Sequence, residues 1–322
     1  MRIRRETLQS QTIGWIALSV LIVTSSTYNS FGKQLTTALS PFTILVLSEA
    51  LTAFFVVLAF GFIPTIRKVI QVRTRDFIPI LALGIMNGAI APLIFFKGLS
   101  MTTAVNAELF GRFEMVALLI LAIAILREEH LTRTHVIAGS VILSGILFVA
   151  MRGFQEAFSF QLGDILLIIS TFIFASGSIV YKKYLQDIPP EVVIVSRATT
   201  AACIFLIVTP FIGHPLISEL RAFPVVLIPA LLGFAFISRF LNLFSFYEAI
   251  ERLPVSVFSM FSTLNIIGGV LFATLYLGES IEWYHLIGGA LVVLGALLLE
   301  ILGIHPTEKS AEEHLRQHHR HL

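Results

Sequence analysis

Six charged residues lie inside stretches of sequence that are otherwise almost entirely apolar. They are three acids and three bases: Glu49, Glu108, Arg112, Glu114, Arg197 and Arg239. A charged side chain at the centre of a bilayer costs roughly 2.5–3.5 kcal/mol on insertion scales. If all six faced lipid, the cost would be on the order of 15–20 kcal/mol, so we expect them to face one another, a wet cavity, or both.

Solute binding and proton coupling are the chemistry that these groups could support. A guanidinium group is a planar fork that holds a carboxylate or phosphate through two hydrogen bonds, so Arg239 and Arg112 are predicted to contact a solute. Glu49 and Glu114 are candidates for proton coupling, because buried carboxyl groups can serve as proton donors and acceptors. The alternative is structural, since buried ion pairs can simply hold helices in register.

Helical spacing sorts these residues further. Glu108 and Arg112 are four residues apart, so they are predicted to pair on one face of a helix. Glu114 lies about 200° around the helix from Arg112 and is expected to need a different partner. Asn242 and several phenylalanines surround Arg239 in the sequence, and none of them carries a negative charge. Its partner must therefore come from another segment, and Glu114 is one candidate.

For other polar residues within or beside the spans, a structural role is at least as well supported as a functional one. Asn87 and Asn265, each in the middle of an apolar stretch, either line a cavity or join helices. Capping of helix ends is predicted for the pairs Glu129 and Glu279, and His135 and His285. The histidines of the last segment, from His314 to His321, are spaced for a metal, but a short terminal segment is more often solvated. No metal site is predicted.

The elements that must position these residues are membrane-spanning helices. Hydrophobic residues make up 56% of the 322 residues and charged residues only 13%, about half of what soluble domains carry. In lipid a segment must satisfy its own backbone hydrogen bonds, and roughly 20 helical residues span the core. Ten such stretches are predicted: 12–32, 41–62, 77–97, 103–126, 134–151, 162–183, 190–211, 224–247, 254–277 and 284–303. The first is rich in small polar residues, whereas the fifth and tenth are almost purely apolar and are expected at the periphery.

An internal repeat relates the two halves of the chain at a separation of about 150 residues. The matching residues include Pro79 and Pro229, Glu129 and Glu279, His135 and His285, Gly139 and Gly289, and Gly145 and Gly295. Lys33 matches Lys182, and Glu49 and Arg197 occupy equivalent positions in the two copies. The predicted domains are therefore two five-helix repeats, 12–151 and 162–303, and a cytoplasmic polar tail, 304–322.

The distribution of positive charges predicts how the chain is oriented in the membrane. If the N-terminus is cytoplasmic, fifteen of the 22 Lys and Arg lie in cytoplasmic segments and four on the opposite side. Cytoplasmic loops of membrane proteins carry an excess of Lys and Arg, so this orientation is the expected one. Five spans per repeat is an odd number, so the second repeat must be inverted in the membrane. The loop charges agree, because Arg127 and Arg133 follow the fourth span and no Lys or Arg lies between the ninth and tenth. We expect a multi-pass protein of the cell (plasma) membrane with both termini cytoplasmic.

Two loose motifs, each present in both halves, resemble a known family. They are Leu126-Arg-Glu-Glu129-His-Leu-Thr132 followed by Ile137-Ala-Gly139-x5-Gly145, and Leu277-Gly-Glu279-Ser-Ile-Glu followed by Ile287-Gly-Gly289-x5-Gly295. In this order they resemble the EamA-type transporters of the drug/metabolite transporter superfamily. The stretch Arg112-Phe113-Glu114 departs from that family, where it is more often uncharged. The resemblance implies a small polar metabolite or drug-like solute.

The expected function is secondary transport by alternating access between the two inverted repeats. The alternative is a channel or membrane scaffold without saturable transport. An enzyme is not expected, because Walker A, His-Glu-x-x-His and Gly-x-Ser-x-Gly sequences are all absent. No cofactor and no nucleic acid are expected; the partners are a solute and the bilayer. A homodimer, and proton or sodium as coupling ion, are left open.

Overall fold

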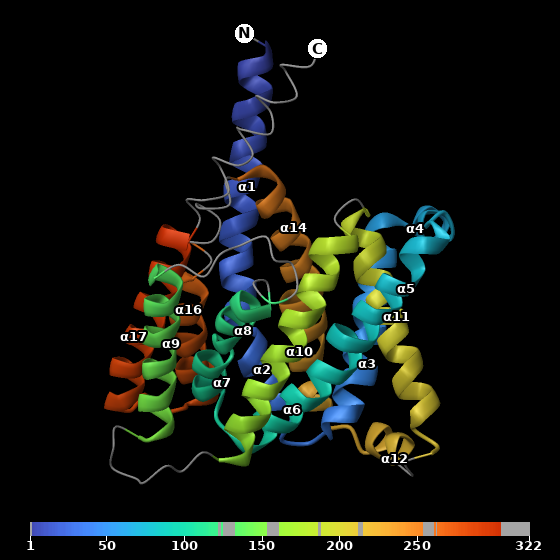
Figure 1. Cartoon of the computed structure of the whole chain (residues 1–322). Coiled ribbons are helices and arrows are strands. Elements are labelled where there is room, and N and C mark those ends of the chain that lie inside the picture. The colour runs from blue at the N-terminus through green and yellow to red at the C-terminus, as the bar shows by residue number, and fades with distance from the viewer. Residues whose placement is uncertain are drawn as a thin grey trace.

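The computed structural model describes residues 2–121, 124, 133–152, 161–185, 188–211, 215–253, 261 and 263–303. Within these residues all regular structure is helical, and the helices form one bundle (Figure 1). The first half contains α1 (Arg2–Ser26), α2 (Tyr28–Leu35), α3 (Pro41–Phe60), α4 (Phe62–Ile70), α5 (Thr74–Leu83), η1 (Gly84–Ile90), α6 (Ala91–Met101), α7 (Ala104–Phe110), α8 (Phe113–Leu121) and α9 (Arg133–Ala150). The second half contains α10 (Leu162–Tyr184), α11 (Pro190–Val208), α12 (Leu216–Arg221), η3 (Val225–Leu227), α13 (Ile228–Gly233), η4 (Phe234–Leu241), α14 (Asn242–Arg252), α16 (Leu264–Leu277) and α17 (Trp283–Gly303).

Several described helices are long and apolar enough to cross a membrane. Six meet that standard: Pro41–Phe60, Thr74–Met101, Arg133–Ala150, Leu162–Tyr184, Pro190–Val208 and Val225–Ala249. Two shorter apolar helices are Leu264–Leu277 and Trp283–Leu299. Each of the eight coincides with an expected span, although the first part of the ninth span lies outside the described residues.

The first and fourth expected spans are interrupted. The first breaks at Thr27, between α1 and α2, and the fourth breaks at Gly111 and Arg112, between α7 and α8. A break leaves backbone groups without helical partners, so in a membrane it is tolerated only inside protein or beside a wet cavity. Both breaks adjoin residues of the predicted polar site.

The third and eighth spans each contain a π-helical segment at the same place in the repeat. These segments are η1 and η4, which begin at Gly84 and Phe234, 150 residues apart. A π segment widens one turn and redirects the side chains in it, and such segments occur often at functional sites. Their matching positions agree with duplicated halves.

The two halves are interleaved. In the first half α1 packs on α14 and α16 of the second, and α3 packs on α11 and η4. In the second half α10 packs on α6 and α8, and α11 packs on η1. The centre of the bundle is therefore built from both halves.

Helices α9 and α17, the fifth and tenth spans, lie side by side at one edge of the bundle, as expected (Figure 1). Glycines allow the close approach: a Cβ atom on Gly145 would lie 2.6 Å from the carbonyl oxygen of Gly288, and one on Gly295 would lie 2.7 Å from Ile142 Cγ1. These glycines pack helices within one chain. They are not available as a contact surface for a second copy.

Candidate functional site

Among the ion pairs of the described residues, the most buried one joins the two halves. Arg239, on η4, donates a hydrogen bond from Nη2 to Oε1 of Glu49, on α3. The Glu49 side chain is fully buried and that of Arg239 is 3% exposed. The ring of Phe234 also lies 5.8 Å from the Arg239 guanidinium carbon, within the range of a cation–π contact. A glutamate thus pairs with Arg239, but it is Glu49, and the candidate partner Glu114 is wrong.

Arg197, on α11, stands beside this pair. It interacts electrostatically with Glu49 and Arg239, and with the hydroxyl groups of Tyr28 and Tyr247. Arg197 is partly exposed, and among the described residues it makes no hydrogen bond and no ion pair within 4 Å. We call Glu49, Arg197 and Arg239 the cationic cluster. The repeat-equivalent residues Glu49 and Arg197 thus both belong to it.

Close packing of α11 on η1 fixes the position of Arg197. A Cβ atom on Gly88, in η1, would lie 3.1 Å from the carbonyl oxygen of Arg197 and 2.9 Å from Ala201 Cβ. One on Gly84 would lie 2.7 Å from Thr200 Cβ. The two glycines of the π segment therefore let the backbone of α11 approach directly.

A second set of charges gathers where the fourth span breaks. Arg112 donates a hydrogen bond from Nη2 to Oδ1 of Asn265, on α16. It interacts electrostatically with both Glu108 and Glu114. We call Glu108, Arg112 and Glu114 the acidic cluster, since its formal charges sum to minus one.

The two predictions made from helical spacing have different outcomes. Arg112 interacts electrostatically with Glu108, as predicted, although the two form no ion pair within 4 Å in the described part of the chain. It interacts with Glu114 as well, which was expected to need a different partner. That expectation assumed a continuous helix, but the chain turns at Gly111 and Arg112.

The Glu108 carboxyl group occupies space that a glycine leaves free. It contacts Gly269 of α16 so closely that a Cβ atom there would overlap it. Glu108 is 5% exposed, and its Oε1 atom has no hydrogen-bond partner in the described structure. The amide of Asn29, on α2, interacts with the same carboxyl group.

Small polar residues near the break at Thr27 join the first span to the second half. The Asn242 amide donates to the Ser25 hydroxyl at 2.6 Å. The hydroxyl oxygens of Thr27 and Ser238 are also 2.6 Å apart. Asn242, predicted as a site residue, therefore connects α14 with α1.

Asn87 joins helices in a related way. Its amide donates to the Phe174 carbonyl of α10 at 3.2 Å, and its side chain packs on Gly177. Of the two roles left open for Asn87, the structure brings out the contact between helices. Asn265, by contrast, holds Arg112.

Sequence reasoning missed the residues that reach both clusters from the first span. Tyr28 interacts with the cationic cluster and Asn29 with the acidic one. Tyr247 was also missed. The polar composition of the first span pointed to this segment. It could not tell which cluster each side chain reaches, because that depends on the break at Thr27.

Comparison with known proteins decides the family. A model of the EamA-like transporter family matches residues 12–151 and, a second time, residues 161–301. The chain belongs to the EamA-like transporter family. This is a family of membrane transporters and not of enzymes. The protein is thus a multi-pass integral membrane protein with two EamA domains, and the resemblance predicted from its repeated motifs is confirmed.

Known relatives of this EamA transporter carry the same general description. It is 25% identical over 71% of its length to an uncharacterized transporter of Methanothermobacter thermautotrophicus, of which the match spans 66%. It is 25% identical over 72% of its length to one of Synechocystis, of which the match spans 68%. A solved crystal structure aligns with 91% of this chain and 97% of its own, with a TM-score of 0.61 and 16% identity. That likeness concerns the fold alone.

A glutamate of the second EamA domain caps a helix of the first. The two carboxylate oxygens of Glu279 accept hydrogen bonds from the backbone N–H groups of Ala104 and Val105, at 2.8 and 2.9 Å. These are orphan donors at the start of α7, where a negative charge is favoured. The capping role predicted for Glu279 is confirmed. Glu129 lies outside the described residues.

The symmetric histidines also lie at helix starts. His285 Nδ1 accepts a hydrogen bond from the Glu282 N–H group at 3.0 Å, and its Nε2 lies 3.1 Å from Asn106 Oδ1. His285 therefore caps α17, as predicted. His135 is buried in the first turn of α9. The histidines of the tail lie outside the described residues.

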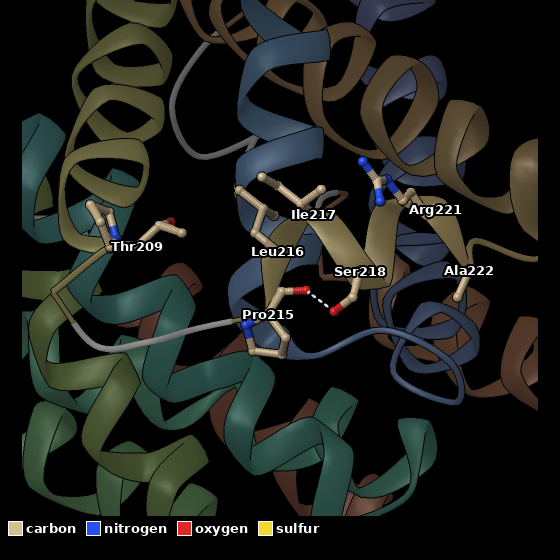
Figure 2. Close-up of a pocket in the computed structure, with 8 residues that line it drawn as sticks. Thr209, Pro215, Leu216, Ile217, Ser218, Arg221 and Ala222 are labelled. Atoms are coloured by element: carbon tan, nitrogen blue, oxygen red, sulfur yellow. Dashed lines mark hydrogen bonds between the residues drawn. The ribbon is translucent and has the colours of Figure 1, made fainter.

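An open groove of about 790 Å³ lies beside α12 (Figure 2). Its lining includes Thr209, Leu216 and Arg221. At its edge the Ser218 hydroxyl donates to the Pro215 carbonyl at 2.8 Å. All nine predicted site residues are described, and none lines this groove. The two charge clusters therefore remain the candidate site of the EamA bundle.

Proposed function

We propose that this EamA transporter is a secondary carrier that moves a small polar solute by alternating access between two inverted repeats. The observation that carries the proposal is the pair of charge clusters between elements of both halves. In each cluster some charges are partly exposed although they lie within spans: Arg197 in one, Arg112 and Glu114 in the other. Sites of secondary carriers lie at such repeat interfaces, beside interrupted helices.

Unequal contacts at the two ends of the bundle support alternating access. At one end Tyr276 donates a hydrogen bond to Gln34, and its ring meets Phe31 edge-on at 5.2 Å. Lys33 donates to the Leu99 carbonyl at 2.9 Å. Its repeat mate Lys182 is exposed and makes no hydrogen bond within the described residues. Equivalent lysines of the two repeats thus have different surroundings. In an alternating cycle each repeat would adopt the conformation that the other now has.

Short helices after the second and seventh spans support the inverted relation. Lys68, on α4, pairs with Glu191 at the start of α11, at 2.6 Å. Glu219, on α12, accepts hydrogen bonds from the N–H and hydroxyl groups of Ser40 before α3, at 3.1 and 2.9 Å. Each short helix docks at the start of the corresponding span of the other repeat.

The proposed topology has ten spans, with both termini in the cytoplasm of a plasma-membrane protein. Its repeats are 12–151 and 162–303, followed by the tail 304–322. The site residues are those of the two clusters, with Asn87, Asn242 and Asn265 joining or supporting their helices. The path opens alternately to the two sides as the repeats rock about these clusters.

Flux into proteoliposomes tests the carrier. A thermal-shift screen of small polar metabolites first identifies a ligand, whose radiolabelled form is then followed into liposomes with and without protein. We expect saturable uptake that is accelerated by unlabelled ligand inside. Uptake that stays linear with concentration and shows no such counterflow would identify a channel. Binding without any flux would identify a scaffold.

A further inference from the structure

The cationic cluster has one positive charge more than its acids can balance. Among the described residues, Glu49 is the one carboxylate that interacts electrostatically with Arg197, and its Oε1 is already engaged by Arg239. Tyr28 and Tyr247 contribute neutral hydroxyl groups. An uncompensated charge inside a membrane protein is costly and is a mark of function.

Exposure separates the two arginines of the cluster. Arg239 is bound to Glu49 and only 3% exposed, so its guanidinium group is closed to a solute in this structure. Arg197 is partly exposed and, as far as the chain is described, has no hydrogen-bond or ion-pair partner. Arg197 is thus the more accessible of the two cations.

Unsatisfied buried atoms at the Glu49–Arg239 pair are an independent sign that the cluster lacks a partner group. Nε and Nη1 of Arg239 and Oε2 of Glu49 are buried and have no hydrogen-bond partner in the described structure. Buried polar groups in proteins are normally paired. Arg239 also lies near enough to Arg197 for the two positive charges to interact. An anion bound at Arg197 would relieve this repulsion.

We propose that Arg197 binds an anionic group, a carboxylate or a phosphate, of the transported solute, and that Arg239 supplies a second positive charge behind it. The proposal rests on the carrier function proposed above and names the class of its substrate. The guanidinium fork gives two parallel hydrogen bonds to such a group, which an ammonium group cannot reproduce. A low dielectric constant around the cluster strengthens the attraction.

Binding of simple anions to the full-length protein tests the site. The protein is placed in nanodiscs of phosphatidylcholine, and its unfolding midpoint is measured against increasing benzoate or inorganic phosphate, with choline chloride at equal ionic strength. We expect at least one anion to raise the midpoint saturably, because a ligand that binds only the folded state stabilises it. Choline should have no such effect.

Variants separate Arg197 from general electrostatics. Arg197→Gln is expected to raise the half-saturating anion concentration at least tenfold, and Arg197→Lys severalfold. The matched control is Arg73→Gln, at an exposed arginine before α5, which should bind as the wild type does. An undiminished response in Arg197→Gln overturns the proposal. If that variant does not fold, wild-type affinity in Arg197→Lys overturns it.

Two further experiments distinguish a lipid headgroup from a solute as the bound anion, and failure of the anion site from failure of the carrier proposal. Loss of the response when phosphatidylglycerol is added would assign the site to a lipid headgroup and overturn a solute site; an unchanged response supports the solute. Binding of benzoate or phosphate without counterflow in proteoliposomes keeps the anion site and contradicts the carrier. Counterflow of a cationic or neutral solute that Arg197→Gln leaves intact keeps the carrier and contradicts the anion site.

Discussion

At the scale of single residues, we expect the ion pair of Glu49 and Arg239 to hold helices together, whereas Arg197 is the residue proposed to bind the solute. The pair joins residues 190 positions apart, a separation at which sequence spacing carries no information about contact. Glu49→Gln should lower the free energy of unfolding by about 3–5 kcal/mol, because it leaves the Arg239 charge buried without compensation. Adding Arg239→Gln should recover part of that loss. Reversible unfolding in a mixed-detergent titration measures both changes.

A matched control for this pair lies on α14. Glu248 and Arg252 form an ion pair at 2.7 Å with both side chains more than a quarter exposed. Glu248→Gln should cost no more than about 0.5 kcal/mol, as is usual for helical pairs four residues apart. A Glu49→Gln protein as stable as this control, with no gain in the double variant, would show that the Glu49–Arg239 pair does not hold α3 and η4 together.

At the scale of elements, hydropathy predicted the apolar helices and their order, but it could not predict where they break. Neither break contains a proline: one falls at Thr27 among small polar residues and the other at Gly111 and Arg112. A break needs partners from other helices, such as Ser238 for Thr27 and Asn265 for Arg112. Those partners are distant in sequence. Reasoning from an unbroken helix therefore misplaced Glu114 relative to Arg112.

The packing of α9 on α17 yields a prediction for two glycines of one helix. Gly145→Ala should destabilise the protein by about 1–3 kcal/mol, as overpacking does, because the new methyl group would lie 2.6 Å from the Gly288 carbonyl oxygen. Gly139→Ala, also on α9, meets no atom of the described residues within 4 Å and should change stability by no more than about 0.5 kcal/mol. The mixed-detergent titration compares them. Equal effects would mean that α9 and α17 can separate without cost.

At the scale of the whole molecule, duplication explains why the two halves share a frame of helices and yet differ in their charged site residues. The π segments η1 and η4 recur at matched places, and Glu49 and Arg197 are matched positions with opposite charges. A duplicated gene thus supplies two similar frames whose site residues have diverged. The repeat was readable from the sequence because glycine, proline and glutamate keep their spacing. The divergence of the site residues was visible in the sequence only as the replacement of an acid, Glu49, by a base, Arg197, at the matched position.

The proposed five spans per repeat, an odd number, make a sharp prediction about the two membrane faces. Cys203, the single cysteine, is replaced by alanine, and Ser280→Cys and Gln71→Cys are made separately at exposed positions before α17 and before α5. An impermeant thiol reagent should label Ser280→Cys in intact cells, and Gln71→Cys only after the cells are opened. The reason is that positive charge gathers around position 71 and is missing around position 280. Labelling of both from the same side would place an even number of spans between them, and the two five-span repeats could not then be inverted.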